Sequence, residues 1–266
     1  MTGMITNPAI RQAMLILMCV FTAGLVCADS TWIGAVSTDF MDSANWNPSG
    51  APNGVVSIGP GSPNNPVFSN TSISYYSVSS LPVNAGGVLT VSAGELRPTS
   101  SAYWNGTICI TGGSLNVRNN IYIGSGSGTG VVTITGGTLV CKSTLTVGSG
   151  SGSSGLLNVW GGVVYMGGIR VAYNGATGKI NIRKNGVVRY TGDAVSFFTG
   201  LVNAGLLTTE PGWQVEIIYS EALNQTIVTT TQLSTPKRYM EKLDRGVVAV
   251  WQGGSKVYVG WRMLGT

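Results

Sequence analysis

Between residues 106 and 182, apolar and polar residues alternate in short stretches that recur at a nearly constant interval. Each stretch begins with a glycine, and these glycines, at positions 106, 130, 155 and 178, are 24, 25 and 23 residues apart. Alternation with a period of two is the pattern of a β-strand that buries one face. We therefore expect four equivalent strands, whose buried pairs are Ile108 and Ile110, Val132 and Ile134, Leu157 and Val159, and Ile180 and Ile182.

Two further strands are expected in each repeat. In the second repeat, the second strand buries Leu139 and Cys141, and the third buries Leu145 and Val147. The corner after the first strand carries a glycine pair in three repeats and an Asn-Gly pair in the last, and both residue types tolerate a positive φ. A loop of small residues, such as 148–154, closes the circuit.

Three short strands and three corners in about 24 residues describe one coil of a right-handed parallel β-helix, in which coils stack about 4.8 Å apart. A single coil cannot bury its own apolar face, so several coils must supply the core together. With residues 87–105 as an earlier, shorter copy, the sequence predicts about five coils. The alternative all-β architecture is a β-sandwich, but it needs hairpin turns of the Asn-Gly or Asp-Gly type, which are scarce here.

The flanking segments are expected to cap the ends of the solenoid, which would otherwise expose unpaired strand edges. Asp193 is the predicted N-cap of a helix that runs to Asn203 and ends at Gly205. The alternating segments 213–219 and 226–231 follow it as a hairpin. The expected parts are a signal peptide (1–28), an N-terminal cap with the first strands (29–86), the β-helix repeats (87–192), a C-terminal cap (193–235) and the start of an incomplete β-sheet domain (236–266).

The N-terminal segment has the pattern of a signal peptide. An apolar run of 13 residues, 14–26, follows the basic residue Arg11 and leads into Val-Cys-Ala. A membrane anchor would need about 20 apolar residues. Cleavage after Ala28 would give a secreted or cell-surface protein with no membrane span. Lipid attachment at Cys27 is the alternative, but lipoprotein cleavage requires a small residue where Val26 stands.

The composition limits the chemistry that the chain can perform. It has 39 glycines, 9% charged residues and no histidine, which excludes Ser-His and Cys-His pairs and the commonest metal ligand. Glu95 is the one acidic residue between 87 and 190, too few for glycoside hydrolysis or for calcium-binding turns. We therefore expect no catalytic residue, metal site or cofactor in this chain. Cys109 and Cys141 could form a disulfide after export, or fill small apolar positions as free thiols.

The coils are expected to carry a positive charge, because residues 87–190 hold eight basic residues against that one acid. Arg118 and Lys142 have the same offset in successive repeats, so they should lie one above the other, about 4.8 Å apart. Such a column of cations could follow an acidic polymer, or could simply keep exposed strand edges from pairing. Nucleic acid is not an expected partner, because aromatic residues do not interleave with the basic ones as stacking platforms.

Aromatic residues in the repeats are a second carbohydrate signal, because their rings can stack on sugars. Trp160 takes the offset of Thr111 and Thr135 in neighbouring coils, a corner position where the indole would either stack on a sugar or cover a loop. Tyr165 follows in the same repeat. The candidate carbohydrate-binding residues are Arg118, Lys142, Trp160, Tyr165 and Arg170.

Residues 31–34 read Thr-Trp-Ile-Gly, residues 45–46 read Asn-Trp, and a Thr-Gly-Gly-Thr/Ser-Leu phrase recurs in the coils. Together with the exit at residues 200–211 and its hairpin, these phrases resemble the glycine-rich solenoids of exported bacterial surface proteins, of the autotransporter and anchor-sorted types. The resemblance extends over residues 31–233. It implies a β-helix and, most often, a role in display or adhesion.

Residues 243–250 read Leu-Asp-Arg-Gly-Val-Val-Ala-Val, and residues 257–266 read Val-Tyr-Val-Gly-Trp-Arg-Met-Leu-Gly-Thr. With their hairpin spacing, these phrases resemble the opening of the β-sheet domain that begins family-eleven bacterial rhamnogalacturonan lyases. Gly260 stands where the family usually has serine, and Trp251 is unusual after the first strand. The resemblance covers 29 residues, 238–266.

This second resemblance implies that the chain is the N-terminal portion of a secreted lyase that cleaves rhamnogalacturonan by β-elimination. The catalytic part of that family is a calcium-bearing β-propeller, which would follow residue 266, so neither catalytic nor calcium-binding residues are assigned here. The chain alone is expected to be inactive, with the solenoid as a spacer, a tether or a module that holds an acidic plant polysaccharide. The alternative is a structural surface or adhesion protein with no enzymatic partner.

Overall fold

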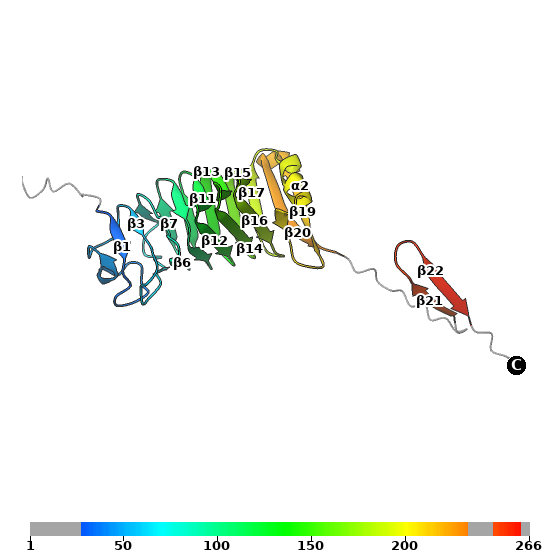
Figure 1. Ribbon diagram of the computed structural model, residues 1–266, viewed down its shortest axis with the longest axis horizontal. Coiled ribbons are helices and arrows are strands. Elements are labelled where there is room, and N and C mark those ends of the chain that lie inside the picture. Colours follow the sequence, from blue (N-terminus) through cyan, green and yellow to red (C-terminus); the bar gives the residue numbers. More distant parts are fainter. Residues whose placement is uncertain (1–27, 234–246, 262–266) are drawn as a thin grey trace, which may run out of the picture. The chain divides into compact units, whose positions relative to one another are not determined.

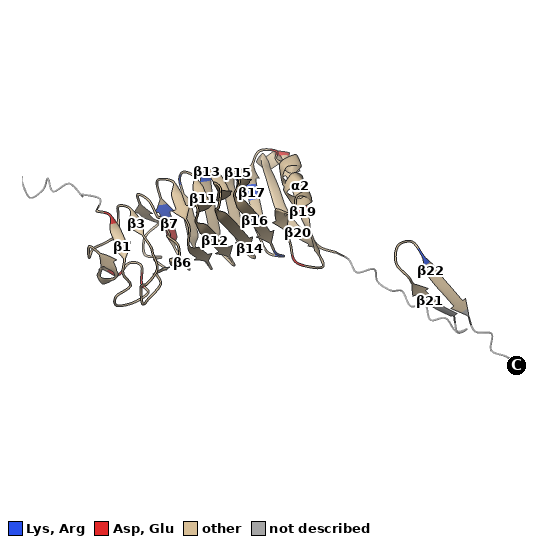
Figure 2. Ribbon diagram, viewed as in Figure 1, with Lys and Arg blue, Asp and Glu red and all other residues tan. Residues whose placement is uncertain are grey.

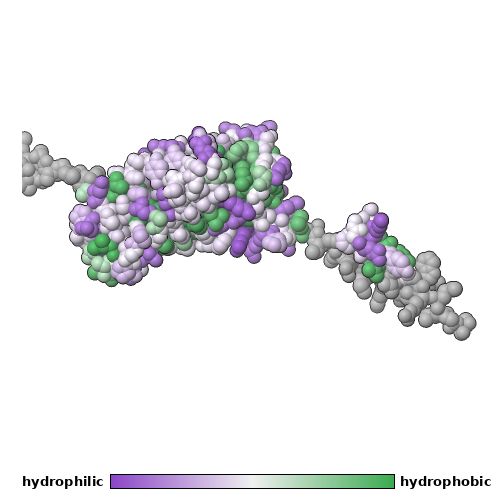
Figure 3. Space-filling view, in the orientation of Figure 1, coloured by the Kyte–Doolittle hydropathy of each residue, from purple (hydrophilic) through white to green (hydrophobic). Residues whose placement is uncertain are grey.

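The computed structural model describes residues 28–233 and 247–261, which fall into two compact units divided after Gln232 (Figure 1). The predicted signal peptide lies outside the described residues except for Ala28. The first unit is a parallel β-helix, as the repeat pattern predicts, and its coils stack along one axis. Much of its surface in Figure 3 is pale, because small Gly, Ser and Thr residues of intermediate hydropathy cover the coils.

One sheet contains seven parallel strands, each from a successive coil. In spatial order they are β4 (Val67–Phe68), β6 (Val88–Val91), β9 (Thr107–Ile110), β12 (Thr129–Ile134), β14 (Ser154–Val159), β16 (Thr177–Ile182) and β18 (Leu207–Thr208). The prediction of about five coils was therefore too low. The first and last coils contain strands of only two residues here, too short to show an alternating pattern in the sequence.

A ten-stranded sheet forms the other sides of the coils. Its main path runs through β5 (Tyr76–Val78), β7 (Glu95–Pro98), β10 (Ser114–Val117), β13 (Thr138–Ser149), β15 (Val163–Tyr173), β17 (Val187–Thr191), β20 (Gln225–Gln232) and β19 (Trp213–Ser220). Off this path, β8 (Ala102–Trp104) pairs with β11 (Ile121–Ser125), and β11 pairs with the second half of β13. The second and third strands that we expected in each repeat are continuous in β13 and β15, although β15 contains the pair Gly167 and Gly168.

The core consists of aliphatic columns that run through the stack. Residues paired in register on the seven-stranded sheet form one such column, and all of them are at most 2% exposed: Leu89, Ile108, Val132, Leu157, Ile180 and Leu207. The corners allow the coils to approach closely. At Gly137 the backbone has a φ of 69°, and a Cβ atom would collide with the carbonyl oxygen of Gly113 in the coil below, so glycine is required.

A ladder of polar side chains links the coils on the outer face of the same sheet. The Asn158 amide donates a hydrogen bond to the hydroxyl of Thr133 (3.1 Å), and the Asn181 amide donates to Oδ1 of Asn158 (3.1 Å). The Thr208 hydroxyl in turn donates to Oδ1 of Asn181. These bonds add a side-chain connection between four successive coils to the backbone ladders.

Both ends of the solenoid are covered. At the start, β1 (Ser30–Trp32), the 3-10 helix η1 (Ser43–Asn45), β2 (Trp46–Asn47) and β3 (Val56–Ser57) enclose an aromatic cluster. Its rings meet edge to face, with centroids 4.9 Å apart for Trp32 and Trp46 and 5.0 Å apart for Phe40 and Trp46. The packed aromatic rings therefore close the first coil.

At the other end, helix α2 (Val195–Asn203) precedes the hairpin of β19 and β20, which are joined by the 3-10 helix η2 (Glu221–Leu223). Gly205, with a φ of 69°, follows the helix as predicted. The predicted N-cap was wrong by one residue: Ala194 takes that place, because its carbonyl oxygen accepts the first helical hydrogen bond, from the N–H of Phe198 (3.0 Å). The N–H of Ala194 donates to the Thr226 hydroxyl (2.8 Å). The Asp193 carboxylate still accepts a bond from the N–H of Val195 (3.1 Å).

The second unit is a single antiparallel hairpin of β21 (Val247–Trp251) and β22 (Val257–Trp261). It lies where the two phrases near the end of the sequence predict a pair of strands. Its side chains include exposed apolar residues, among them Trp251 (56% exposed) and Tyr258 (63%). No helix among residues 28–233 and 247–261 is long and apolar enough to cross a membrane.

Candidate functional site

Outward-facing side chains of the ten-stranded sheet form rows along the solenoid axis. The strand register places Asn116, Val140, Tyr165 and Arg189 opposite one another on β10, β13, β15 and β17. Two residues further along the strands, Arg118 and Lys142 follow the paired residues Val117 and Cys141, so they occupy adjacent coils as their common offset predicts. Basic residues on β7, β13 and β17 are among the few charged positions in Figure 2.

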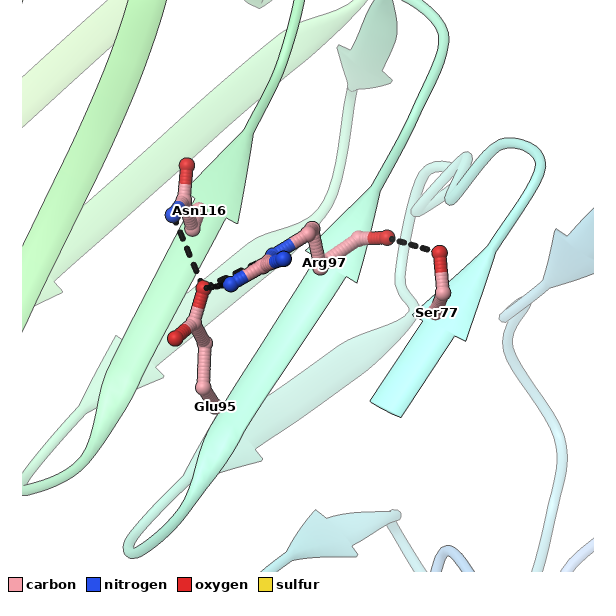
Figure 4. Close-up of polar contacts among 4 residues, drawn as sticks. All are labelled: Ser77, Glu95, Arg97 and Asn116. Carbon is pink, nitrogen blue, oxygen red and sulfur yellow. Dashed lines mark hydrogen bonds and ion pairs between the residues drawn. The ribbon is translucent and has the colours of Figure 1, made fainter. Parts of the chain in front are cut away.

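A shallow hollow of about 440 Å³ lies at the start of these rows, lined by Arg97, Asn116, Arg118 and Lys142. The charge of Arg97 is neutralised there. Its guanidinium forms an ion pair with Glu95 (2.7 Å), and the Asn116 amide donates to the same carboxylate oxygen (2.8 Å), as Figure 4 shows. The Arg97 guanidinium also lies 3.6 Å from the ring centroid of Tyr75, which fixes its position further.

Arg118 and Lys142, by contrast, are exposed and have no acidic partner. The contact between Arg97 and Glu95 is the one ion pair found in the described part of the chain. The amide nitrogen of Asn116 donates a hydrogen bond to Glu95, but the buried Oδ1 of the same side chain accepts no hydrogen bond from the described residues. The first hollow is therefore lined by two cations without acidic partners, Arg118 and Lys142, and by Asn116, whose Oδ1 is an unsatisfied hydrogen-bond acceptor.

A second hollow, of about 330 Å³, continues toward the C-terminal cap, and Lys142 lines it as well. Tyr165, which is 37% exposed, and Arg189, which is half-buried, lie on its walls. One Arg189 amino group donates to the Gln225 side chain on β20 (3.3 Å), and its guanidinium carbon is 5.9 Å from the Tyr165 ring centroid. No carboxylate lines either hollow. We call the two hollows together the basic groove.

A local irregularity of the backbone helps to shape the groove. The pairing of β13 with β15 shifts after Cys141, so that Lys142 and Ser143 on β13 lie opposite the single residue Gly167 on β15. A Cβ atom at Gly167 would lie 2.9 Å from the carbonyl oxygen of Lys142. Gly167 is exposed and lines the second hollow together with Lys142 and Thr191.

The other two predicted residues lie outside the groove. Trp160 sits at the corner after β14, where the guanidinium of Arg183 from the next coil covers its ring at 4.0 Å. The indole is therefore covered on that face and is not a freely open sugar platform. Arg170 projects from the third side of the coil, opposite Thr146, and lies 4.8 Å from the Tyr173 ring centroid.

Two groove residues were missed by the sequence reasoning. Arg189 could have been found, because it follows the corner residue Gly186 by three residues, as Tyr165 follows Gly162 in the preceding coil. Gln225 could not, because it comes from an antiparallel hairpin that does not follow the repeat.

A stacked pair outside the groove was missed as well: the rings of Tyr103 and Tyr122 lie 4.8 Å apart and nearly parallel on adjacent coils.

The groove is suited to binding an anion. Its residues are cationic, aromatic or neutral. The nearby carboxylate of Glu95 forms an ion pair with Arg97 and accepts a hydrogen bond from Asn116. No group of three His, Cys, Asp or Glu side chains in residues 28–233 and 247–261 could hold a metal ion. Cationic side chains on a low-dielectric wall attract and concentrate anionic ligands.

No protein-family model matches this chain, and no curated protein or solved structure does so at a significant level.

Proposed function

We propose that the coiled unit binds an acidic plant polysaccharide along the basic groove, as a non-catalytic module of a secreted rhamnogalacturonan lyase. The observation that carries the proposal is the set of three cations without acidic partners, Arg118, Lys142 and Arg189, on the walls of adjoining hollows. Tyr165 adds an exposed ring, which can pack on the apolar face of a sugar.

The lyase part of the proposal is supported by the two phrases at residues 243–250 and 257–266. Strands β21 and β22 lie within them, except that β21 ends one residue later at Trp251, and the two strands pair as a hairpin. A two-stranded hairpin is marginally stable alone, and exposed apolar residues such as Trp251 suit a strand pair that packs in a larger sheet. Neither catalytic nor calcium-binding residues are proposed in this sequence. Secretion is proposed from the apolar run at residues 14–26.

Affinity electrophoresis in a gel that contains a rhamnogalacturonan-rich pectin tests the binding. The chain should be retarded at low salt, and retardation should weaken as salt screens the exposed charges. The double substitution Arg118→Ala/Lys142→Ala should weaken binding roughly tenfold, which corresponds to about 1.4 kcal/mol.

The matched control is Lys179→Ala/Lys184→Ala, which removes two exposed charges outside the groove. It should leave retardation close to that of the unsubstituted chain. Equal losses in both double variants would indicate a general charge effect and contradict a groove. Absence of retardation even at low salt would leave the solenoid as a spacer.

A further inference from the structure

Strand β19 forms the last edge of the ten-stranded sheet. It pairs with β20 through all eight of its residues, and β20 is the one strand that pairs with it among the described residues. The backbone N–H and C=O groups on its other edge therefore have no strand partner there. The strand also lacks the usual protections of an edge, because it contains no proline and no basic residue and its register with β20 has no bulge.

The inner face of β19 is apolar and incompletely covered. Val215 and Ile217 pack against the core of the solenoid, yet both side chains are only half-buried. Val228, which lies opposite Ile217 on β20, is fully buried. The apolar layer of the sheet thus becomes exposed at its last strand. Apolar side chains of a further strand would remove this surface from water.

The outer face of β19 is acidic. Glu216 is exposed in the middle of the strand, where its carboxylate accepts a hydrogen bond from the Thr231 hydroxyl of β20 (2.7 Å). Glu210 precedes the strand and Glu221 follows it, whereas residues 191–233 contain no lysine or arginine. A further strand with basic residues on its outer face would complement this charge.

These acids argue against a second copy of this chain as the partner. Two copies joined through β19 would bring two acidic strands together, and like charges on neighbouring strands destabilise their pairing. We infer instead that the free edge of β19 binds an extended segment of a partner protein, in which lysine or arginine alternates with apolar residues. The segment adds a strand to the sheet: its apolar residues lie beside Val215 and Ile217, and its basic residues lie beside Glu216. This inference depends neither on the basic groove nor on the lyase.

Fluorescence anisotropy of the full chain with a labelled peptide that alternates lysine with valine, and that has the eight-residue length of β19, tests the inference. Two further probes have the same sequence but carry N-methyl groups on alternate amides, one on the odd positions and the other on the even positions. An added strand bonds to its neighbour through every second N–H. One methylated probe should therefore bind roughly tenfold more weakly, and the other should bind like the parent peptide.

A charge reversal makes the test specific to β19. Glu216→Lys should weaken binding of the lysine peptide roughly tenfold and strengthen binding of a matching peptide that alternates glutamate with valine. Asp39→Lys, which reverses the charge of an exposed residue in the N-terminal cap, is the matched control and should change neither affinity. Hydrogen exchange locates the peptide, which should slow exchange in β19 and leave β9 and β12 unchanged. Melting temperatures would verify that both variants are folded.

Several results would overturn strand addition at β19: equal binding of all three lysine probes, no binding of the parent peptide, or equal effects of Glu216→Lys and Asp39→Lys. Dimerisation of the unsubstituted chain through β19, seen by analytical ultracentrifugation, would identify a second copy as the occupant and would also contradict the inference. The proposed function is tested separately. Arg118→Ala/Lys142→Ala, which should weaken pectin binding, should leave peptide binding unchanged, and Glu216→Lys should leave the groove intact.

Discussion

At the scale of single residues, the two thiols of the coils face different surroundings. Cys141 is buried on β13, and its thiol donates a weak hydrogen bond to the carbonyl oxygen of Asn119 (3.4 Å). Burial raises the pKa of Cys141 from 9.0 to about 11. Cys109, half-buried on β9 of the other sheet, is also free, and burial raises its pKa. Both thiols therefore stay protonated at neutral pH, which makes them poor nucleophiles.

The raised pKa of Cys141 predicts a loss of stability at alkaline pH. The unfolded chain releases this proton near pH 9, whereas the folded chain holds it up to about pH 11, so the free energy of unfolding should fall as the pH rises between these values. The expected contribution is about 2–3 kcal/mol. Urea unfolding of the unsubstituted chain and of Cys141→Ala at pH 8 and pH 11 measures it. Parallel declines in the two proteins would contradict this explanation.

At the scale of elements, the hairpin of β19 and β20 terminates the ten-stranded sheet. Strand β20 runs antiparallel to β17 and covers its edge, and Val228 is fully buried in that contact. An uncovered β17 would present unpaired backbone groups to a second molecule. The hairpin is thus expected to keep the solenoid monomeric.

Val228→Asp tests the role of the hairpin. An unpaired charge at this buried position should cost about 3–5 kcal/mol, detach β20 and expose β17. Size-exclusion chromatography should then show dimers or aggregates, together with a lower melting temperature. Gln232→Asp, which places the same charge at an exposed position of the same strand, should remain monomeric. A monomeric Val228→Asp protein with unchanged melting would show that the hairpin is dispensable.

The sequence predicted those elements whose local pattern is strong. Alternation of apolar and polar residues predicted the glycine-marked strands and the hairpin of β19 and β20. The need for a positive φ predicted the glycine after the helix. The coils outside the regular repeat were missed, because strands as short as β4 and β18 display no period. The repeat offset located Arg118 and Lys142, and the distance from the corner glycine Gly186 indicates Arg189, but Gln225 lies outside the repeat. The contact of the Arg183 guanidinium with the Trp160 ring could not be predicted, because it depends on side-chain conformations that a position in the repeat does not specify.

At the scale of the whole molecule, each coil is bonded mainly to its two neighbours, so stability should be nearly one-dimensional. Both Leu157, in a middle coil, and Leu207, in the last one, belong to the same buried column. A truncation at either position removes similar apolar contacts. The consequences should differ, because a middle coil has partners on both sides and an end coil can open alone.

Hydrogen exchange of Leu157→Ala and Leu207→Ala measures this difference. Each substitution should cost about 2–5 kcal/mol locally. Leu207→Ala should speed exchange in β18 and leave β9 and β12 protected, whereas Leu157→Ala should loosen β12 and β16 on both sides. Uniform acceleration throughout the solenoid in both variants would instead indicate a single cooperative unit.

The direction of the backbone ladders has a mechanical consequence. Between parallel coils the hydrogen bonds point roughly along the long axis, from one coil to the next. A pulling force applied to the two ends of the solenoid would load these junctions in series, so the weakest junction would yield first and the coils would peel away one at a time. A module built in this way would lengthen stepwise under tension, and a link between a surface and a polymer would stretch before it broke.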